Sequence, residues 1–236
     1  ELSSLRAASQ QLSQRAERLD GLINNAGLMA LPYSTTKDGF EMQIGTNHLG
    51  HFALTSLVLP LLVRTGGARV VTVSSLVHKF GNVVVDDLFF QRRRYDKWLA
   101  YGQSKLANLL FALELDRRLK AKNLDVLSLA AHPGYAATEL QTKGPKLSGS
   151  SLGEWMMKSG NSLFAQTQER GALPELRALT DPGARAGEYY GPSGFMEVAG
   201  DAVLVAPAKR ALDVELARAL WERSVELTGE DFSGLL

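Results

Sequence analysis

The stretch Arg69-Val70-Val71-Thr72-Val73-Ser74-Ser75 is dominated by β-branched residues, a composition typical of a buried strand. Two further apolar runs are predicted to form strands, one at Leu22-Ile23 and one at residues 124–131. Helical patterns separate these runs, and such alternation predicts a parallel α/β sheet with right-handed crossovers. At 236 residues the chain is long enough to bury one core, so we expect a single domain over residues 1–236.

Small and polar residues follow each predicted strand. In open parallel sheets a ligand binds outside the carboxyl ends of the strands, and Asn25, Ser75 and Gly134 all lie at such ends. Small residues there let a ligand approach the backbone closely. For Asn24-Asn25-Ala26-Gly27 alone, the alternative is a plain turn with Asx hydrogen bonds. The convergence of three strand ends nevertheless predicts a ligand site at this edge of the sheet.

A pair of residues with acid–base potential opens the helix that is predicted from Tyr101 to about Ala121. Tyr101 and Lys105 are four residues apart, so they share a helix face. A cation within about 4–6 Å favours the phenolate and lowers the pKa of a tyrosine. The pair can therefore act as a general acid/base on an alcohol or ketone oxygen. Tyr33 and Lys37 have the same spacing, but they lie in a stretch that is predicted to be a loop.

A second long helix is predicted from Lys37 to about Val63, with Thr36 or Asp38 as its N-cap. Asn47 lies inside this helix with a glycine on either side. Asparagine is a mediocre residue for a helix interior, and nearby glycines indicate close packing or a kink. Either close packing or a kink is therefore expected near Asn47.

Composition excludes several kinds of site. Cysteine is absent, so the chain has no disulfide, thiolate metal site or cysteine nucleophile. His48 and His51 are three residues apart, but no acidic partner lies at a sensible spacing, so we assign both to packing or hydrogen bonding and predict no metal site. The net charge of +1 argues against a nucleic-acid-binding protein. The run Arg92-Arg93-Arg94-Tyr95 is interpreted as part of a solvated loop.

The longest apolar stretch, Leu57 to Val63, is short and contains Pro60, so no membrane-spanning helix is predicted and we expect a cytoplasmic protein. The helix from Tyr101 is apolar on two sides, which indicates either deep burial or an oligomer interface. The remaining expected elements are a surface helix at 2–19, loop-like structure at 76–100, a short last strand at 187–191 and a helix at 213–228.

Residues 139–200 are expected to form the region that covers a substrate. Within it, residues 139–170 are amphipathic and rich in glycine and serine, which suits a mobile lid over an apolar ligand. The alternative is a helix pair packed on the edge of the sheet.

Five motifs in order carry a family resemblance. They are Asn24-Asn25-Ala26-Gly27, Asn47, Ser74-Ser75, Tyr101-x-x-Ser104-Lys105 and Pro133-Gly134. Together they resemble the short-chain dehydrogenase/reductase family. The segments 46–52 and 132–134, and the long stretch between Ser75 and Tyr101, resemble its retinol-dehydrogenase-like branch.

This resemblance implies a Rossmann-like doubly wound parallel sheet and an NAD(P)-dependent oxidoreductase. Tyr101 would be the acid/base, and Lys105 would lower its pKa and hold the nicotinamide ribose. Ser75 would hydrogen-bond the substrate oxygen, and Asn47 would hold a water in a proton relay to Lys105. The cofactor-binding residues it implies are Asn25, Ala26, Gly27, Tyr101, Lys105, Pro133, Gly134, Ala136 and Thr138.

The resemblance also implies partners. The cofactor would be NADP or NAD, with NADP favoured, and the substrate an alcohol or carbonyl compound of apolar character, such as a retinoid, a steroid or a xenobiotic carbonyl. A homodimer would form through the helices at 37–63 and 101–121.

One departure from the family pattern is large. Members begin with a strand, a Gly-rich turn and a helix that hold the pyrophosphate, and no such turn precedes Asn25. One explanation is a longer native protein that carries these strands upstream of Glu1. Such an upstream segment could also contain a membrane anchor. The other is a catalytically silent short form that acts as a binding or assembly protein, completed by strands of a partner.

Overall fold

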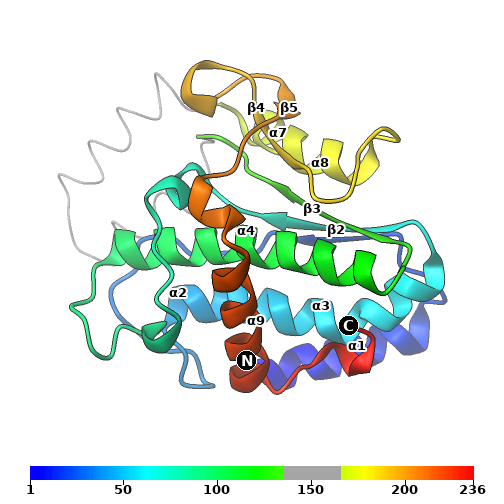
Figure 1. Cartoon of the computed structure of the whole chain (residues 1–236), viewed down its shortest axis with the longest axis horizontal. Helices are drawn as coiled ribbons and strands as arrows, with labels where there is room; N and C mark the ends of the chain where they lie inside the picture. The colour runs from blue at the N-terminus through cyan, green and yellow to red at the C-terminus, as the bar shows by residue number, and fades with distance from the viewer. Residues whose placement is uncertain (136–165) are drawn as a thin grey trace.

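A five-stranded sheet forms the centre of the computed structural model, which describes residues 1–135 and 166–236 (Figure 1). The strand order is β1-β2-β3-β4-β5, and the first four strands run parallel. The strands are β1 (Gly21–Asn24), β2 (Ala68–Val73), β3 (Val126–Ala131), β4 (Tyr189–Pro192) and β5 (Ala202–Leu204). The three predicted parallel strands are therefore confirmed and lie side by side in chain order.

The register brings the carboxyl ends of these strands to one edge. Asn24 at the end of β1 pairs with Thr72, and Val73 at the end of β2 pairs with Ala131. The valines of β2 are buried, as expected for a parallel strand that is covered on both faces. Residues that directly follow β1, β2 and β3 consequently meet at the same end of the sheet.

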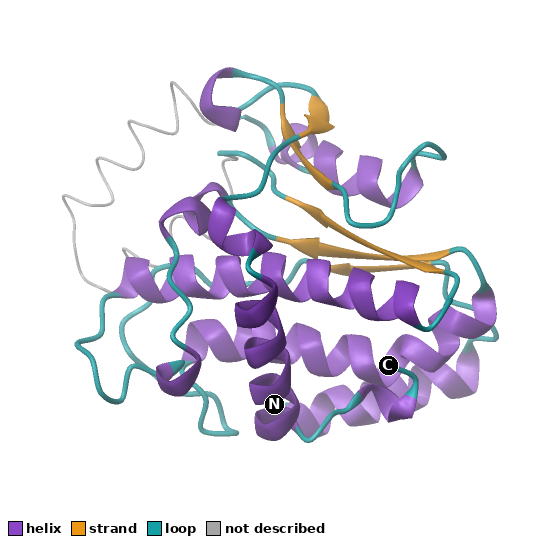
Figure 2. Ribbon diagram, in the orientation of Figure 1, coloured by secondary structure: helices purple, strands orange, loops and turns teal. Residues whose placement is uncertain are grey.

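Helices cover both faces of the sheet, so the doubly wound α/β class is confirmed (Figures 1 and 2). One face carries α1 (Leu2–Arg15), α3 (Gly50–Thr65), α4 (Lys97–Ala121) and α9 (Val214–Thr228), and α8 (Leu173–Thr180) packs on the other after the short α7 (Gln168–Gly171). The helix predicted at 213–228 ends as expected, because Gly229 adopts the left-handed conformation of a helix stop.

The helix that carries Tyr101 begins one turn earlier than predicted. The Asp96 side chain accepts hydrogen bonds from the backbone N–H groups of Trp98 and Leu99, so Asp96 is the N-cap of α4. Tyr101 therefore lies in the second turn of the helix, where the backbone is fully hydrogen-bonded. The loop-like prediction for 76–100 is wrong at this end, and short 3-10 turns interrupt the rest.

The helix predicted at 37–63 begins at Met42 instead of Lys37. Glu41 is its N-cap and accepts from the backbone N–H groups of Gln43 and Ile44, so the prediction of Thr36 or Asp38 is wrong. Asp38 instead accepts a hydrogen bond from the Leu2 N–H at the start of α1. Its carboxylate serves another helix because the chain between 35 and 41 folds back on itself.

The helix is irregular around Asn47. Between α2 (Met42–Ile44) and α3, the segment Gly45–Leu49 is π-helical. A π-helical turn holds one residue more than an α-helical turn, and such turns are frequent at functional sites. On the N-terminal side of this turn, the Gln43 side chain binds the Ala30 N–H, the Tyr95 hydroxyl and the Lys97 carbonyl.

Contacts within a single chain explain why α4 is apolar on two sides. Its outer strip packs against α9 and the C-terminal segment in an aromatic cluster of Phe52, Phe111, Trp221 and Phe232. The ring centroids of Trp221 and Phe232 are 4.5 Å apart, and those of Phe52 and Trp221 are 5.0 Å apart. The pattern therefore reflects deep burial, and the dimer stays a prediction.

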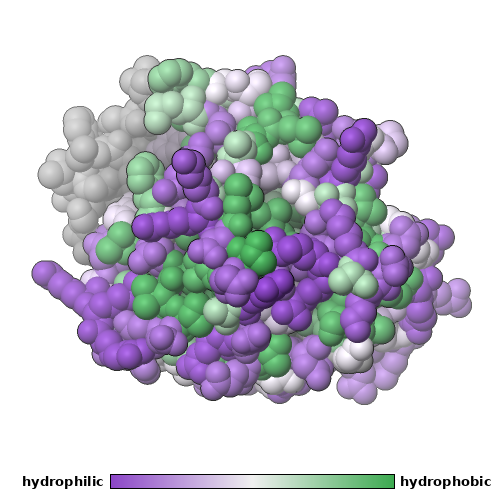
Figure 3. All heavy atoms as spheres, viewed as in Figure 1, coloured by the Kyte–Doolittle hydropathy of each residue, from purple (hydrophilic) through white to green (hydrophobic). Residues whose placement is uncertain are grey.

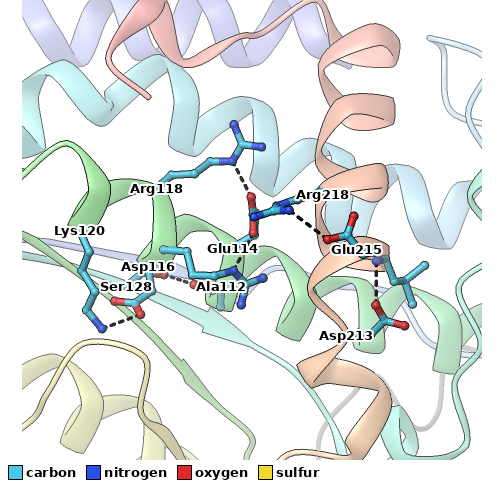
Figure 4. Close-up of polar contacts among 11 residues, drawn as sticks. Ala112, Glu114, Asp116, Arg118, Lys120, Ser128, Asp213, Glu215 and Arg218 are labelled. Atoms are coloured by element: carbon cyan, nitrogen blue, oxygen red, sulfur yellow. Dashed lines mark hydrogen bonds and ion pairs between the residues drawn. The ribbon is translucent and has the colours of Figure 1, made fainter.

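Ion pairs of α4 and α9 are drawn in Figure 4. The buried Glu114 carboxylate pairs with Arg117 and Arg118, each at 2.8 Å, and Asp116 pairs with Lys120 at 2.7 Å. In the space-filling view, which shows the face on which α9 lies, hydrophobic patches alternate with hydrophilic residues (Figure 3).

The helical segment Met42–Thr65 is long and apolar enough to cross a membrane by length and composition alone. In its most apolar window 67% of the residues are buried inside the fold, and α3 packs against α1 and β2. This segment is therefore a helix of the protein core.

The C-terminal part of the sheet differs from expectation. The strand predicted at 187–191 exists as β4 but is not the last, because β5 returns antiparallel to it. We call the connection between them, residues 193–201, the 193–201 loop. Residues 166–200 of the predicted substrate-covering region thus form α7, α8, β4 and this loop. Residues 139–165 lie outside the described residues, so the lid stays a prediction.

Candidate active site

Tyr101 of α4 lies beside Ser75, which directly follows the residues at the carboxyl end of β2. The tyrosine is buried and Ser75 is half-buried. Burial raises the pKa of Tyr101 to about 12, and the hydrogen bond from Ser75 opposes this increase. The phenol therefore keeps its proton at neutral pH and is set up as a proton donor.

Lys105 lies one turn further along the same face of α4. Its Nζ lies over the Tyr101 ring, 5.8 Å from the centroid, and donates to the Val73 carbonyl oxygen at 3.2 Å. Burial lowers the pKa of Lys105 to about 8, while the carboxylate of Glu175 opposes this decrease. A net lowering of the Tyr101 pKa, as predicted, is wrong for this structure, because burial of the phenol raises this pKa to about 12.

Hydrogen bonds fix α4 against the end of β2. The Ser74 hydroxyl donates to the Lys105 carbonyl at 2.8 Å, and the Asn108 amide donates to the Val73 carbonyl at 2.9 Å. Asn108 was missed in the sequence, where its only signal is a polar residue within an apolar helix. The same carbonyl thus receives both Lys105 and Asn108, which sets the height of Lys105 above the sheet.

Asn47 is fully buried, and both the oxygen and the nitrogen of its side-chain amide form hydrogen bonds. Its Oδ1 accepts from the Leu28 N–H at 2.7 Å, and its Nδ2 donates to the Leu28 carbonyl and the Ser104 hydroxyl, each at 2.9 Å. The side chain therefore joins the loop after β1 to α4. The predicted water relay at this residue stays a prediction.

Gly27 brings this loop close to the other site residues. A Cβ atom at position 27 would lie 3.2 Å from Asn47 Oδ1 and 3.7 Å from Lys105 Nζ. The glycine thus leaves both polar atoms uncovered. The neighbouring Asn25 and Ala26 are exposed at the end of β1, which agrees with the predicted ligand edge.

The two histidines of the π-helical region have separate surroundings. His48 Nε2 lies 2.9 Å from the Ser224 hydroxyl, and burial lowers the pKa of His48 to about 3. Burial, and next the positive charge of Lys105, lower the pKa of His51 to about 4. Both rings are neutral at physiological pH. Across residues 1–135 and 166–236, no group of three potential metal ligands occurs.

The loop after β3 requires glycine at position 134. Gly134 has a φ of +66°, and a Cβ atom there would lie 2.4 Å from the Val198 carbonyl oxygen. Pro133 and Gly134 stand beside the other strand ends, as predicted. The predicted residues Ala136 and Thr138 lie outside the described residues. Sequence reasoning missed the acidic residues that face this region, Glu175 on α8 and Glu197 in the 193–201 loop.

Comparisons with known proteins agree with this arrangement. Residues 1–146 match the family model described as short chain dehydrogenase. Retinol dehydrogenase 13 from Homo sapiens is 42% identical over 234 residues, which cover 97% of this chain and 66% of that protein. Retinol dehydrogenase 14 from Homo sapiens is 39% identical over 230 residues, which cover 97% of this chain and 64% of that protein.

A crystal structure of an uncharacterised protein from Mycobacterium paratuberculosis is also similar. It shares 43% sequence identity and superposes with a TM-score of 0.78, covering 98% of this chain and 74% of that one. The chain spans 64–66% of the length of the two curated relatives.

Proposed function

Because the chain belongs to the short-chain dehydrogenase family, we propose that it acts as an oxidoreductase on an alcohol or carbonyl group, with a nicotinamide dinucleotide as cofactor. The observation that carries this proposal is that the buried Tyr101 phenol lies beside Ser75, with Lys105 Nζ 5.8 Å from the centre of the Tyr101 ring on the same helix face. The serine hydroxyl and the phenol each have one proton, and when a substrate oxygen binds between them both protons can turn to that oxygen.

The names of the relatives support an apolar substrate. Two of them are retinol dehydrogenases, and retinol is a long apolar alcohol. An alcohol, aldehyde or ketone on a hydrophobic body is therefore the substrate class that we propose for this chain.

The described residues fit the nicotinamide ribose. Lys105 Nζ has three N–H groups, and within the described parts of the chain it donates one hydrogen bond, to Val73. The missing side chain at Gly27 leaves space beside this ammonium. Lys105 and Tyr101 would hold the ribose, and Pro133 and Gly134 would seat the nicotinamide. Asn25, Ala26 and Gly27 would line the adenosine side. When bound, the cofactor supplies or accepts a hydride.

The protein contributes position and proton transfer. In the direction of reduction, Tyr101 donates its proton to the substrate oxygen as negative charge develops there, and Ser75 donates a second hydrogen bond to that oxygen. In the direction of oxidation, the same groups act in reverse. The Lys105 ammonium stabilises the tyrosinate that remains, because it lies above the ring of Tyr101.

The experiment that tests this role compares two tyrosines. We expect Tyr101→Phe to lower turnover of retinol about 10²–10⁴-fold and to leave cofactor affinity near that of the wild type. Tyr33→Phe is the matched control, because Tyr33 has a lysine at the same spacing but is 50% exposed, and Lys37 pairs with Glu1. Equal turnover in Tyr101→Phe and the wild type would rule out the assignment.

A fluorescence titration with NADPH and then NADH separates the enzyme from a silent binding protein. Saturable binding at micromolar concentration supports the enzyme and ranks the two cofactors. A folded, monodisperse sample of the full-length protein that binds neither cofactor contradicts the proposal.

A further inference from the structure

Glu197 links two segments that border the proposed site. Its Oε2 lies 3.0 Å from His132 Nε2, and its Oε1 accepts from Lys79 Nζ at 2.8 Å. His132 is completely buried and directly precedes Pro133, whereas Lys79 lies in the 3-10 turn that follows Ser75. One carboxylate therefore ties the 193–201 loop to both the end of β3 and the segment after β2.

The hydrogen bonds define which nitrogen of His132 carries the proton. The Gly134 backbone N–H donates to Nδ1 at 3.1 Å, so Nδ1 is the acceptor. Burial lowers the pKa of His132 to about 4, so the ring is neutral and its single proton is on Nε2. His132 Nε2 then donates to Glu197. A continuous chain runs from the Gly134 amide through the imidazole to the carboxylate.

The 193–201 loop also contacts the same turn through its backbone. The Tyr135 N–H donates to the Val198 carbonyl at 2.7 Å. A Cβ atom at Gly134 would lie 3.0 Å from the Glu197 carbonyl oxygen, so the two backbones are in close contact. Met196 and Glu197 have φ values of +51° and +59°, a left-handed conformation that persists only where the surroundings hold it. The contacts of Glu197 and Val198 keep the loop in this conformation.

We propose that Glu197 is a positioning residue for the cofactor: by accepting a hydrogen bond from His132, it fixes the imidazole that in turn holds the Pro133–Gly134 turn in the shape that seats the nicotinamide. This inference rests on the proposed function, because it assigns a purpose to the turn that is proposed to bind cofactor. In this proposal Glu197 acts on the cofactor only through His132.

The test measures the dissociation constant of NADPH or NADH for variants of the full-length protein by fluorescence titration. Glu197→Ala removes the acceptor, and we expect the dissociation constant to rise about tenfold, while kcat at saturating cofactor and KM for retinol change less than threefold. Glu197→Gln keeps an oxygen for His132 and loses only the pairing with Lys79. We expect it to bind cofactor within about threefold of the wild type.

Glu215→Ala is the matched control, since Glu215 is also a carboxylate in an ion pair but lies exposed on α9, away from the turn. We expect this variant to bind cofactor like the wild type. Wild-type affinity in Glu197→Ala would overturn the proposal. So would a loss in Glu197→Gln as large as that in Glu197→Ala, because the oxygen acceptor would then not matter.

A spectroscopic measurement keeps the test independent of turnover. The ¹⁵N chemical shifts of the His132 ring should show a protonated Nε2 in the wild type, and the Nε2 shift should change in Glu197→Ala, where this N–H loses its carboxylate acceptor. A protonated Nδ1 in the wild type would contradict the hydrogen-bond chain. A wild type that binds neither cofactor would refute the proposed function, and the ring shifts would still report on the contact between Glu197 and His132.

Discussion

Glu175 provides a quantitative test of the electrostatics around Lys105. This residue of α8 is 6% exposed, and its Oε2 has no hydrogen-bond partner among the residues that the structure describes. Burial raises the pKa of Glu175 from 4.5 to about 7, while its backbone hydrogen bond and the charge of Lys105 oppose this increase. Above pH 7 the folded protein therefore contains a buried, charged carboxylate, and the backbone hydrogen bond and Lys105 offset only part of the cost of removing it from water.

The sign and size of the effect follow from this pKa. A carboxyl whose pKa is higher in the folded state binds its proton more tightly there, so it stabilises the fold below pH 4.5 and loses this contribution as the pH rises through about 7. The difference between the two pKa values corresponds to about 3 kcal/mol. Glu175→Gln keeps the shape and carries no charge. We expect it to be more stable than the wild type by about 3 kcal/mol at pH 8 and by much less at pH 5.

The assay is thermal or urea unfolding at both pH values. For a domain of this size the difference at pH 8 corresponds to an increase in Tm of about 6–12 °C. Glu215→Gln is the control, because the Glu215 side chain is 83% exposed and should show no such dependence on pH. A stabilisation that is equal at pH 5 and pH 8, or a loss of stability at pH 8, would refute the reasoning.

Two further predictions concern packing. Phe232→Ala should lower the free energy of unfolding by about 3–5 kcal/mol, because the buried ring contacts Phe52 and Trp221. Urea unfolding measures this change. Phe80 is exposed, so the control Phe80→Ala should stay within about 0.5 kcal/mol of the wild type. Gly191→Ala should cost about 1–3 kcal/mol and weaken cofactor binding, because its Cβ would lie 2.1 Å from His132 Nε2. A Gly191→Ala protein with wild-type stability and cofactor affinity would show that the His132 ring is not confined.

The sheet and the residues at its carboxyl edge were predictable because their signals are local. The β-branched run of β2 and the turns after β1 and β3 are each contained in a few residues. Once three strands are parallel and adjacent, the geometry of a sheet brings their ends together. Tyr101 and Lys105 were predictable for the same reason, since four residues on a helix define a shared face.

Other features depend on contacts that a local pattern does not contain. Asp38 has the chemistry of an N-cap, but it accepts a hydrogen bond from the Leu2 N–H at the start of α1, 36 residues earlier in the chain. Glu197 meets His132 across 65 residues. The direction of the pKa change at Tyr101 was predicted incorrectly because it depends on how much water the fold removes from the phenol. Spacing along a helix shows that Lys105 lies near Tyr101, but it does not show how deeply the Tyr101 phenol is buried.

The π-helical turn Gly45–Leu49 makes this region sensitive to the number of its residues. Each residue of a helix advances the chain by about 100° and 1.5 Å. Deleting one residue would turn this segment into ordinary α-helix and rotate everything before it by that amount. Gln43, which binds both the loop after β1 and the first residue of α4, would then face another direction. Variation among homologous chains should therefore appear here as exchanged residues and not as insertions or deletions.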